Sequence, residues 1–87
     1  MYVIITYDVN QKRVAKVHKL LKQYLIWIQN SVFEGEIAEG KLKKLKKDIN
    51  KIIKKEEDSV IYFQTYNNKY LKKQVIGNKE IDFTNFL

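Results

Sequence analysis

The sequence predicts an α+β fold, in which an antiparallel sheet carries two helices on one face. Apolar and β-branched segments open the chain and recur after residue 59, and two segments between them repeat apolar residues every three or four positions. Short polar turns separate these segments. The chain has 87 residues, of which 45% are hydrophobic, and this suffices for one domain with a single core, residues 1–87.

The first predicted strand covers residues 2–7, which are β-branched or aromatic almost throughout. Residues 8–10, with the sequence Asp-Val-Asn, then supply a turn and a helix N-cap. From Gln11 the apolar period changes to that of an amphipathic helix, and lysines occupy its other faces. The apolar positions of this helix are Val14, Val17, Leu21, Tyr24 and Leu25.

The second half of the chain repeats the alternation of strand and helix. Residues 28–36 form the second predicted strand, and a second helix with a strongly basic outer surface follows it. Residues 60–65 form the third strand, residues 72–76 are a candidate fourth, and residues 81–87 form a short C-terminal strand. The apolar stripe of the second helix consists of Leu42, Leu45, Ile49, Ile52 and Ile53.

This order of elements matches the split βαβ layout of a ferredoxin-like fold. That layout requires two strands between the helices, where the sequence leaves room for only one clear strand. Either residues 27–36 bend or bulge to supply both strands, or the missing pairing comes from later in the chain. The sequence leaves both alternatives open.

Two of the predicted strands are apolar on both faces, whereas a strand with one buried face alternates apolar and polar residues. They are residues 3–5, Val-Ile-Ile, and residues 60–63, Val-Ile-Tyr-Phe. Two helices cover only one face of the sheet, so we expect the other face to pack against a second copy in a two-fold homodimer. Residues 81–87 are either an edge strand of their own subunit or a strand added to the partner's sheet.

Composition limits the class of protein and its partners. Seventeen Lys and Arg against ten Asp and Glu give a formal net charge of +7, which favours RNA or DNA as a partner; the alternative is a solvated, lysine-rich surface. The chain has no cysteine, which excludes disulfides, thiolate zinc sites and cysteine nucleophiles. No hydrophobic run is long enough to span a membrane, and the expected compartment is the cytoplasm.

Asp8 is the most informative candidate for chemistry, because it stands at the end of the first strand, where a ligand can reach the rim of the sheet. Successive strand residues point to opposite faces. If Val3, Ile5 and Tyr7 face the helices, Asp8 faces the proposed dimer cleft. The alternative role is that of a turn or cap residue, which an Asp at a strand-to-helix junction commonly has.

A two-fold axis would bring two copies of Asp8 together. Magnesium prefers hard oxygen ligands and commonly binds one or two carboxylates, several waters and a substrate phosphate. Such a pair could hold Mg²⁺ and support metal-assisted hydrolysis of a phosphodiester. Glu34 and Glu36 share one strand face and are either secondary ligands or solvent-facing structural residues. His18 is the chain's one histidine, without a neighbouring base in the sequence, and we assign it to structure.

Three motifs give the sequence a specific resemblance. They are Tyr-Asp-Val at residues 7–9, Arg-Val-Ala-Lys at residues 13–16, and Ile-Gln-Asn-Ser-Val-Phe-Glu-Gly at residues 28–35. In this order and spacing they resemble the CRISPR-associated endoribonuclease family. The basic second helix and residues 58–62 and 75–77 extend the resemblance over nearly the whole chain.

The resemblance implies a ferredoxin-like homodimer with facing sheets, and Mg²⁺ or another divalent cation held between the two copies of Asp8. It also implies a second role, because members of the family bind the CRISPR integrase and bridge pairs of it along DNA during spacer acquisition. Nuclease activity on RNA or double-stranded DNA is a property of some members. The implied activity is therefore that of a metal-dependent endonuclease, a phosphodiesterase.

The residues that match the cleft of that family by position are Tyr7, Arg13, Ser31 and Phe33. Each also has an ordinary interpretation. Tyr7 and Phe33 suit a core or an interface, Arg13 suits a solvated surface, and Ser31 suits a hydrogen bond, since no base that could activate it is visible. Trp27 is a departure, because some active relatives have an arginine there, and the change removes a phosphate contact.

Other function classes fit parts of the sequence. A non-catalytic, DNA-binding scaffold of the integrase complex would need the dimer but not the metal, and a toxin-like mRNA interferase with a related fold would need no integrase. An RNA-recognition module needs an aromatic motif with glycines on a central strand, which residues 60–65 do not supply. A small-molecule regulatory domain is less favoured, because the chain has no glycine-rich loop.

Overall fold

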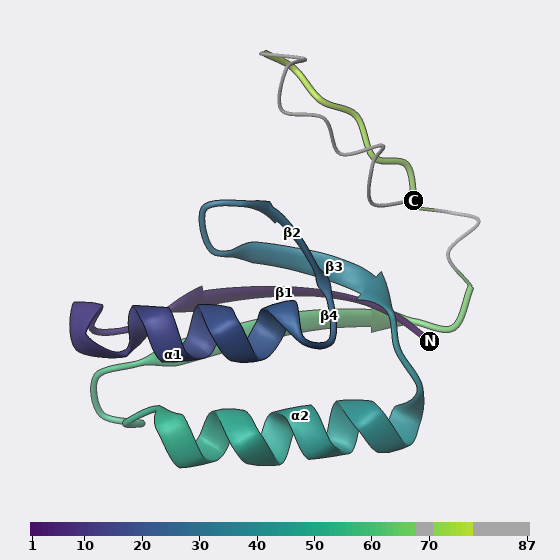
Figure 1. Cartoon of the computed structure of the whole chain (residues 1–87). Helices are drawn as coiled ribbons and strands as arrows, with labels where there is room; N and C mark the ends of the chain where they lie inside the picture. Colours follow the sequence, from purple (N-terminus) through teal and green to yellow (C-terminus); the bar gives the residue numbers. More distant parts are fainter. Residues whose placement is uncertain (68–70, 78–87) are drawn as a thin grey trace.

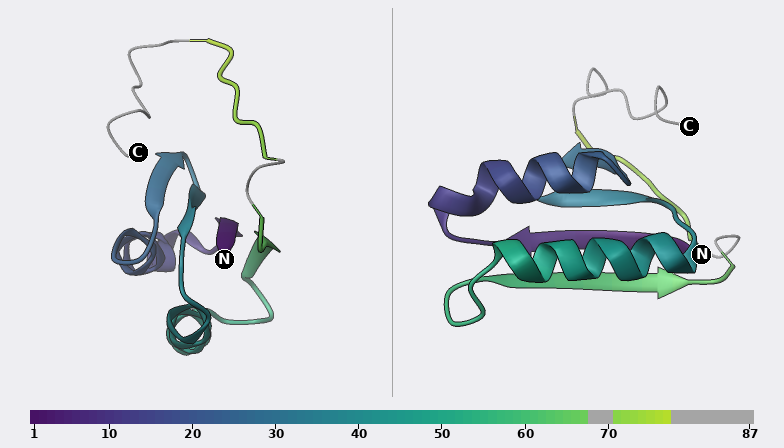
Figure 2. Two further views of the ribbon diagram at one scale, coloured as in Figure 1. Left: turned by 90° about the vertical axis from the view of Figure 1, so that its right-hand side faces the viewer. Right: turned by 60° about the horizontal axis from the view of Figure 1, so that its bottom comes forward.

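The computed structural model describes residues 1–67 and 71–77. Residues 2–65 contain a sheet and a layer of two helices (Figure 1). Both helices lie on one side of the sheet (Figure 2), so the predicted α+β architecture is confirmed. Neither helix is long and apolar enough to span a membrane. The elements run in the order β1 (Tyr2–Asp8), α1 (Gln11–Lys22), β2 (Ile26–Gln29), β3 (Val32–Glu36), α2 (Glu39–Ile52) and β4 (Ser59–Thr65).

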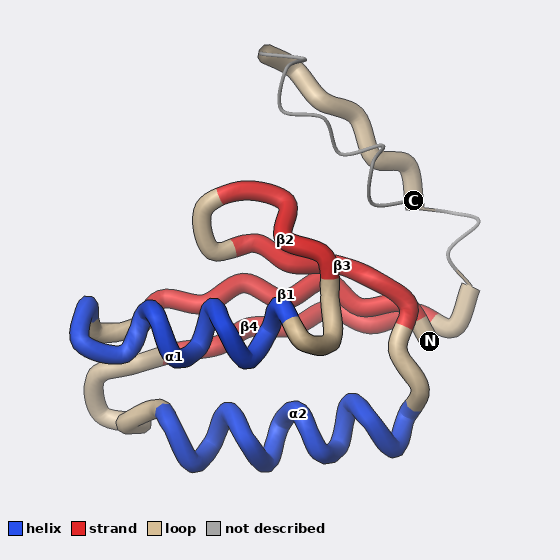
Figure 3. Tube along the Cα trace, in the orientation of Figure 1, coloured by secondary structure: helices blue, strands red, loops and turns tan. Residues whose placement is uncertain are grey.

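The four strands form one antiparallel sheet in the order β2-β3-β1-β4 (Figure 3). β1 is central and pairs with β4 along its whole length, from Tyr2 opposite Thr65 to Asp8 opposite Ser59. The edges of the sheet are therefore β2 and β4. This is the ferredoxin-like arrangement that the sequence predicted.

The segment between the helices supplies both strands of the middle pair, so the first of the two alternatives is correct. β2 and β3 form a hairpin that turns at Asn30 and Ser31. Asn30 has a φ of 45°, a left-handed conformation that Asn tolerates because its short polar side chain can hydrogen-bond locally. The register shifts between Trp27 and Gln29, which marks an irregularity in β2.

The prediction of a strand at residues 72–76 is wrong. Residues 71–77 contain no strand and pair with neither edge of the sheet. Val75 and Ile76 are 50% and 101% exposed, and a β-prone sequence does not form a strand where it pairs with no other strand. The predicted strand at residues 81–87, with its addition to the partner's sheet, lies outside the described residues.

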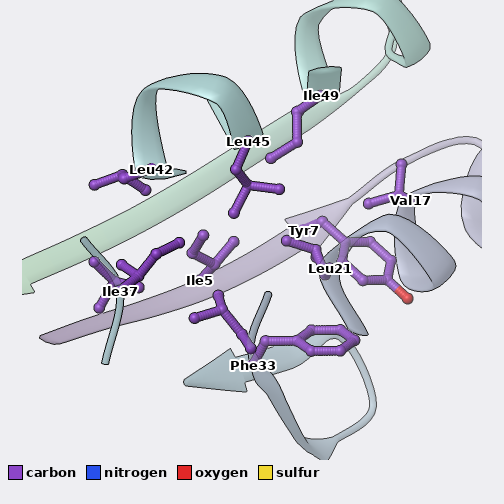
Figure 4. Close-up of a cluster of buried hydrophobic side chains, with 11 residues drawn as sticks. Ile5, Tyr7, Val17, Leu21, Phe33, Ile37, Leu42, Leu45 and Ile49 are labelled. Atoms are coloured by element: carbon purple, nitrogen blue, oxygen red, sulfur yellow. The ribbon is translucent and has the colours of Figure 1, made fainter. Parts of the chain in front are cut away.

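The condition on which the orientation of Asp8 depended is met in β1. Val3, Ile5 and Tyr7 are buried toward the helices, with exposed fractions of 0%, 2% and 9%. Apolar stripes on both helices close this face, and burying each large apolar side chain stabilises the fold by about 1.5–3 kcal/mol. Figure 4 shows most of the cluster, whose other members are Val17, Leu21, Leu25, Phe33, Ile37, Leu42, Leu45 and Ile49.

Neither α1 nor α2, the helices of the described residues, covers the opposite face of the sheet. On this face Ile4 lies across from Phe63, and Thr6 lies across from Ile61. Ile61 and Phe63 are 53% and 63% exposed, although both are large apolar side chains. Ile4 is only half-buried and lines a pocket with residues 71–74. Because neither of these helices packs on it, we call the surface made by Ile4, Ile61 and Phe63 the uncovered face.

Candidate functional site

Asp8 is the last residue of β1 and is exposed at the rim of the sheet. Its neighbour Tyr7 is buried toward the helices, so strand alternation turns Asp8 toward the uncovered face. Asp8 lies in register with Ser59 of β4. The chain thus presents a carboxylate at the end of an apolar surface, where a metal ion or a phosphodiester can approach it.

The turn of the β2–β3 hairpin is fastened to the same end of β1. The backbone N–H of Tyr7 donates to the carbonyl oxygen of Ser31 at 3.3 Å, and the hydroxyls of Thr6 and Ser31 share a hydrogen bond of 3.1 Å. Of the predicted site residues, Ser31 is therefore held beside the end of β1 that carries Asp8. The sequence analysis did not identify Thr6 as a site residue, although it lies two residues before Asp8 and therefore on the same face of the strand.

Tyr7 and Phe33 lie on the helix side of the sheet. Phe33 is fully buried, and its ring centroid is 6.4 Å from that of Tyr7. The Tyr7 hydroxyl and Nδ1 of His18 share a hydrogen bond of 3.3 Å, and burial raises the pKa of Tyr7. Burial, assisted by the charge of Lys22, lowers the pKa of His18. Tyr7 and Phe33 are thus core residues on the helix side of the sheet, and they do not share a face with Asp8.

Arg13 is engaged by a carboxylate that the sequence analysis did not single out. Its Nε lies 2.6 Å from Oδ2 of Asp58 and its Nη2 lies 3.0 Å from Oδ1, so the pair is bidentate. The Asp58 side chain is fully buried and also accepts the backbone N–H groups of Asn10 and Lys54. Hydrogen bonding from Arg13, and then from those N–H groups, outweighs burial and holds the pKa of Asp58 below its usual range.

The two glutamates of β3 lie toward the other end of β1. Glu36 pairs with the N-terminal amine at 2.8 Å, and Glu34 is 8% exposed with Nζ of Lys73 at 2.5 Å from its Oε1. Burial, and then the charge and hydrogen bond of Glu34, raise the pKa of Tyr2 to about 12. Neither glutamate joins Asp8 within one copy. In the described part of the chain, no three His, Cys, Asp or Glu side chains gather as a metal site.

Residues 1–73 match the family model described as CRISPR associated protein Cas2. The CRISPR-associated endoribonuclease Cas2 3 of Thermodesulfovibrio yellowstonii is 53% identical over 81 residues, which cover 92% of each chain. The CRISPR-associated endoribonuclease Cas2 of Dictyoglomus turgidum is 53% identical over 77 residues, which cover 88% of each. The aligned regions cover most of this chain in both comparisons.

Solved structures agree with the sequence comparisons. A crystal structure described as cas2 superposes with a TM-score of 0.82 at 49% identity, over 90% of this chain and 87% of that one. The structure of Streptococcus pyogenes Cas2 at pH 6.5 superposes with a TM-score of 0.78 at 31% identity, over 88% of this chain and 100% of that one. The chain therefore belongs to the family of the CRISPR associated protein Cas2.

Proposed function

We propose that this protein is a magnesium-dependent endonuclease of CRISPR adaptation, which acts as a homodimer on RNA or double-stranded DNA and bridges the integrase during spacer acquisition. The observation that carries the proposal is the position of Asp8, an exposed carboxylate at the end of the uncovered face. Relatives that bear the name CRISPR-associated endoribonuclease support the nuclease activity.

The uncovered face supports the homodimer. Ile61 and Phe63 are more than half exposed, and burying apolar surface contributes about 25 cal/mol per Å². A two-fold axis brings the same surface of two copies together, so each copy would cover the other. An axis that passes near the end of β1 would place the two Asp8 carboxylates next to each other.

The chemistry of Asp8 fits a magnesium ion. Mg²⁺ commonly takes one or two carboxylates and completes its octahedron with waters and substrate phosphate oxygens, so one exposed carboxylate from each copy is sufficient. When bound, the ion would polarise the phosphodiester and lower the pKa of a bound water. Asp8 would hold the ion. The hydrogen bond that the Tyr7 N–H donates to the Ser31 carbonyl oxygen, and the one shared by the Thr6 and Ser31 hydroxyls, would keep the end of β1 in place.

Positive charge supports a nucleic-acid substrate. The chain has a formal net charge of +7, which dimerisation doubles. On α2 the side opposite the core is basic and exposed, with Lys43 and Lys47 one helical turn apart. Such a row suits the phosphates of a duplex, because each neutralised phosphate releases counterions.

A non-catalytic scaffold of the integrase complex is the second candidate. The contact between Arg13 and Asp58 favours it, because the Arg13 side chain is only 11% exposed and its guanidinium is already occupied by a carboxylate. Arg13 is then a structural residue, and its positive charge is not available to contact a phosphate at the site. A scaffold would use the same dimer and the same basic surface without cleaving its ligand.

Cleavage assays with matched variants separate the two candidates. Single-stranded RNA and duplex DNA are incubated with the wild type, with Asp8→Asn and with Glu56→Gln, in Mg²⁺ and in excess EDTA. Glu56 is an exposed acid in the turn before β4, so its variant has the same change of charge away from the site. The endonuclease proposal expects cleavage by the wild type and Glu56→Gln in Mg²⁺, and none by Asp8→Asn or in EDTA.

Equal cleavage by Asp8→Asn and the wild type would contradict the proposed site. Loss of activity in Asp8→Asn, with retained binding to the integrase in a size-exclusion assay, would support an enzyme with a separate bridging role. Absence of cleavage by every form, together with intact binding to the integrase, would favour the scaffold.

A further inference from the structure

Trp27 is an exposed aromatic side chain in a fixed orientation. It is the one tryptophan of the chain, lies on the edge strand β2 and is 41% exposed. Its indole Nε1–H donates to the carbonyl oxygen of Asn30 at 2.9 Å, and its ring meets that of His18 edge to face, with centroids 5.3 Å apart. Two contacts therefore hold the indole, while much of its surface stays open to solvent.

The surroundings of Trp27 are cationic. Residues 9–33 contain no Asp or Glu, and the exposed lysines of this stretch include Lys19 and Lys22 near the end of α1. Lys22 is near enough to His18 for its charge to contribute to the lowered pKa of that imidazole. The carboxylates nearest in sequence are Asp8 and Glu34, and Asp8 faces the other side of the sheet. No acid on α1 or β2 opposes an anionic ligand here.

A shallow hollow on α1 connects the lysines to the tryptophan. Its volume is about 690 Å³. His18 lines the hollow and also contacts the Trp27 ring, so one residue adjoins both features. The hollow is lined by Gln11, Val14, Ala15, His18, Lys19 and Lys22.

An exposed aromatic ring beside lysines is the combination that binds single-stranded nucleic acid. The face of an unpaired base stacks on the ring, while the cations neutralise the neighbouring phosphates. A base within a duplex is stacked on both sides and cannot offer its face. A surface of this kind distinguishes a single strand from a duplex, which a row of lysines alone does not do.

We propose that Trp27 is a stacking platform for one unpaired base of single-stranded RNA, with Lys19 and Lys22 as its phosphate contacts. The choice of RNA rests on the proposed function, whereas the preference for an unpaired base rests on the indole. The Trp27 indole donates a hydrogen bond to the carbonyl oxygen of Asn30. The carbonyl oxygen of the next residue, Ser31, accepts a hydrogen bond from the N–H of Tyr7, which precedes Asp8. The platform is thus coupled through the hairpin turn to the proposed cleavage site.

The intrinsic fluorescence of Trp27 reports on this site directly, because no other tryptophan contributes. Asp8→Asn protein in EDTA is titrated with a short single-stranded oligoribonucleotide, and then with the duplex formed by that strand and its complement. Stacking predicts saturable quenching by the single strand and little quenching by the duplex. Equal quenching by both, or quenching by neither, would overturn the proposal.

This design separates the platform from the proposed nuclease. The titration uses neither Mg²⁺ nor cleavage, so quenching supports the platform even if Asp8 proves to have no catalytic role. Conversely, a single strand that is cleaved through Asp8 without quenching Trp27 would reject the platform and leave the nuclease in place.

Matched variants test the two parts of the surface. In an anisotropy assay with labelled single-stranded RNA, Trp27→Leu should weaken binding by about 5- to 100-fold, and Trp27→Phe by much less. Lys19→Gln with Lys22→Gln should weaken binding and flatten its salt dependence, while the same charge change at Lys43 and Lys47 of α2 should preserve the Trp27 quenching. Equal affinities of Trp27→Leu and the wild type, with thermal melts showing that both are folded, would also reject the platform.

Discussion

Arg13 and Asp58 are 45 residues apart in the sequence and form a bidentate ion pair, with Nε and Oδ2 at 2.6 Å. The same carboxylate accepts the backbone N–H groups of Asn10 and Lys54, at 2.8 Å and 2.9 Å. One buried side chain thereby joins the start of α1 to the segment that enters β4. Because β4 forms half of the uncovered face, this pair also helps to place the strand that the proposed dimer uses.

Asp58→Asn should destabilise the fold markedly, since it removes the buried counter-charge of Arg13, which keeps only the looser contact with Glu57 at 3.5 Å, and weakens the hydrogen bonds to two backbone N–H groups. Asp48→Asn is the matched control, because Asp48 forms a looser pair with Lys51, 3.9 Å apart and within one helix. An exposed pair of this kind contributes about 0–1 kcal/mol. Urea denaturation should show a loss for Asp58→Asn several times that for Asp48→Asn, and equal losses would contradict the assignment.

Stability should fall on acidification, and Asp58 should account for part of the fall. Its folded-state pKa is lowered, so its contribution is complete above the unfolded pKa of about 3.9 and is lost as the pH falls through the folded value. The urea midpoint of the wild type should decrease below about pH 4. Asp58→Asn should have a shallower decrease over that range than Asp48→Asn does, and parallel curves would speak against this origin.

Phe63→Asp should dissociate the proposed homodimer. In the dimer the substitution removes apolar burial worth about 1.5–3 kcal/mol from each copy and sets carboxylates on the shared surface. The dimer dissociation constant should therefore rise by about a hundredfold or more in sedimentation equilibrium. Gln64→Asp is the control, because Gln64 is the next residue of β4 and points to the other face. A Phe63→Asp protein that dimerises like Gln64→Asp would place the interface elsewhere.

The phosphates of duplex DNA should contact the exposed lysines of α2. Replacing Lys43 and Lys47 with Gln should reduce the slope of log affinity against log salt by about 2, because each phosphate contact contributes about 0.9. The double variant at Lys19 and Lys22 should keep the wild-type slope for duplex DNA. Filter binding at several salt concentrations measures both slopes, and an unchanged slope for the α2 variant would make those lysines a solvated surface only.

That residues 2–7 form a strand could be predicted from the sequence, because nearly all of them are apolar or β-branched. What remained open was which alternate side chains face the helices. That choice follows once Tyr7 is placed in the core, and it determines where Asp8 points. The hairpin could only be posed as an alternative, since its turn at Asn30 and Ser31 has no glycine and its two strands together read as one β-prone run.

The environment of Arg13 could not be predicted, because its partner Asp58 lies in a different part of the chain and no local pattern links the two. For Phe33, the sequence supplied the strand but not the face, and the two-sided apolar pattern of the sheet left its side open. The strand expected at residues 72–76 failed for another reason. Local preference for extended structure says nothing about whether a hydrogen-bonding neighbour is within reach.

The adjacency of Tyr7 and Asp8 on opposite sides of β1 has an evolutionary consequence. A single-residue insertion or deletion between residues 2 and 7 would exchange their sides, moving a carboxylate into the hydrophobic interior and a phenol to the surface. Such a change would damage the fold and the proposed catalytic site in the same event. Length variation in this protein should therefore accumulate in the connections and be purged from the first strand.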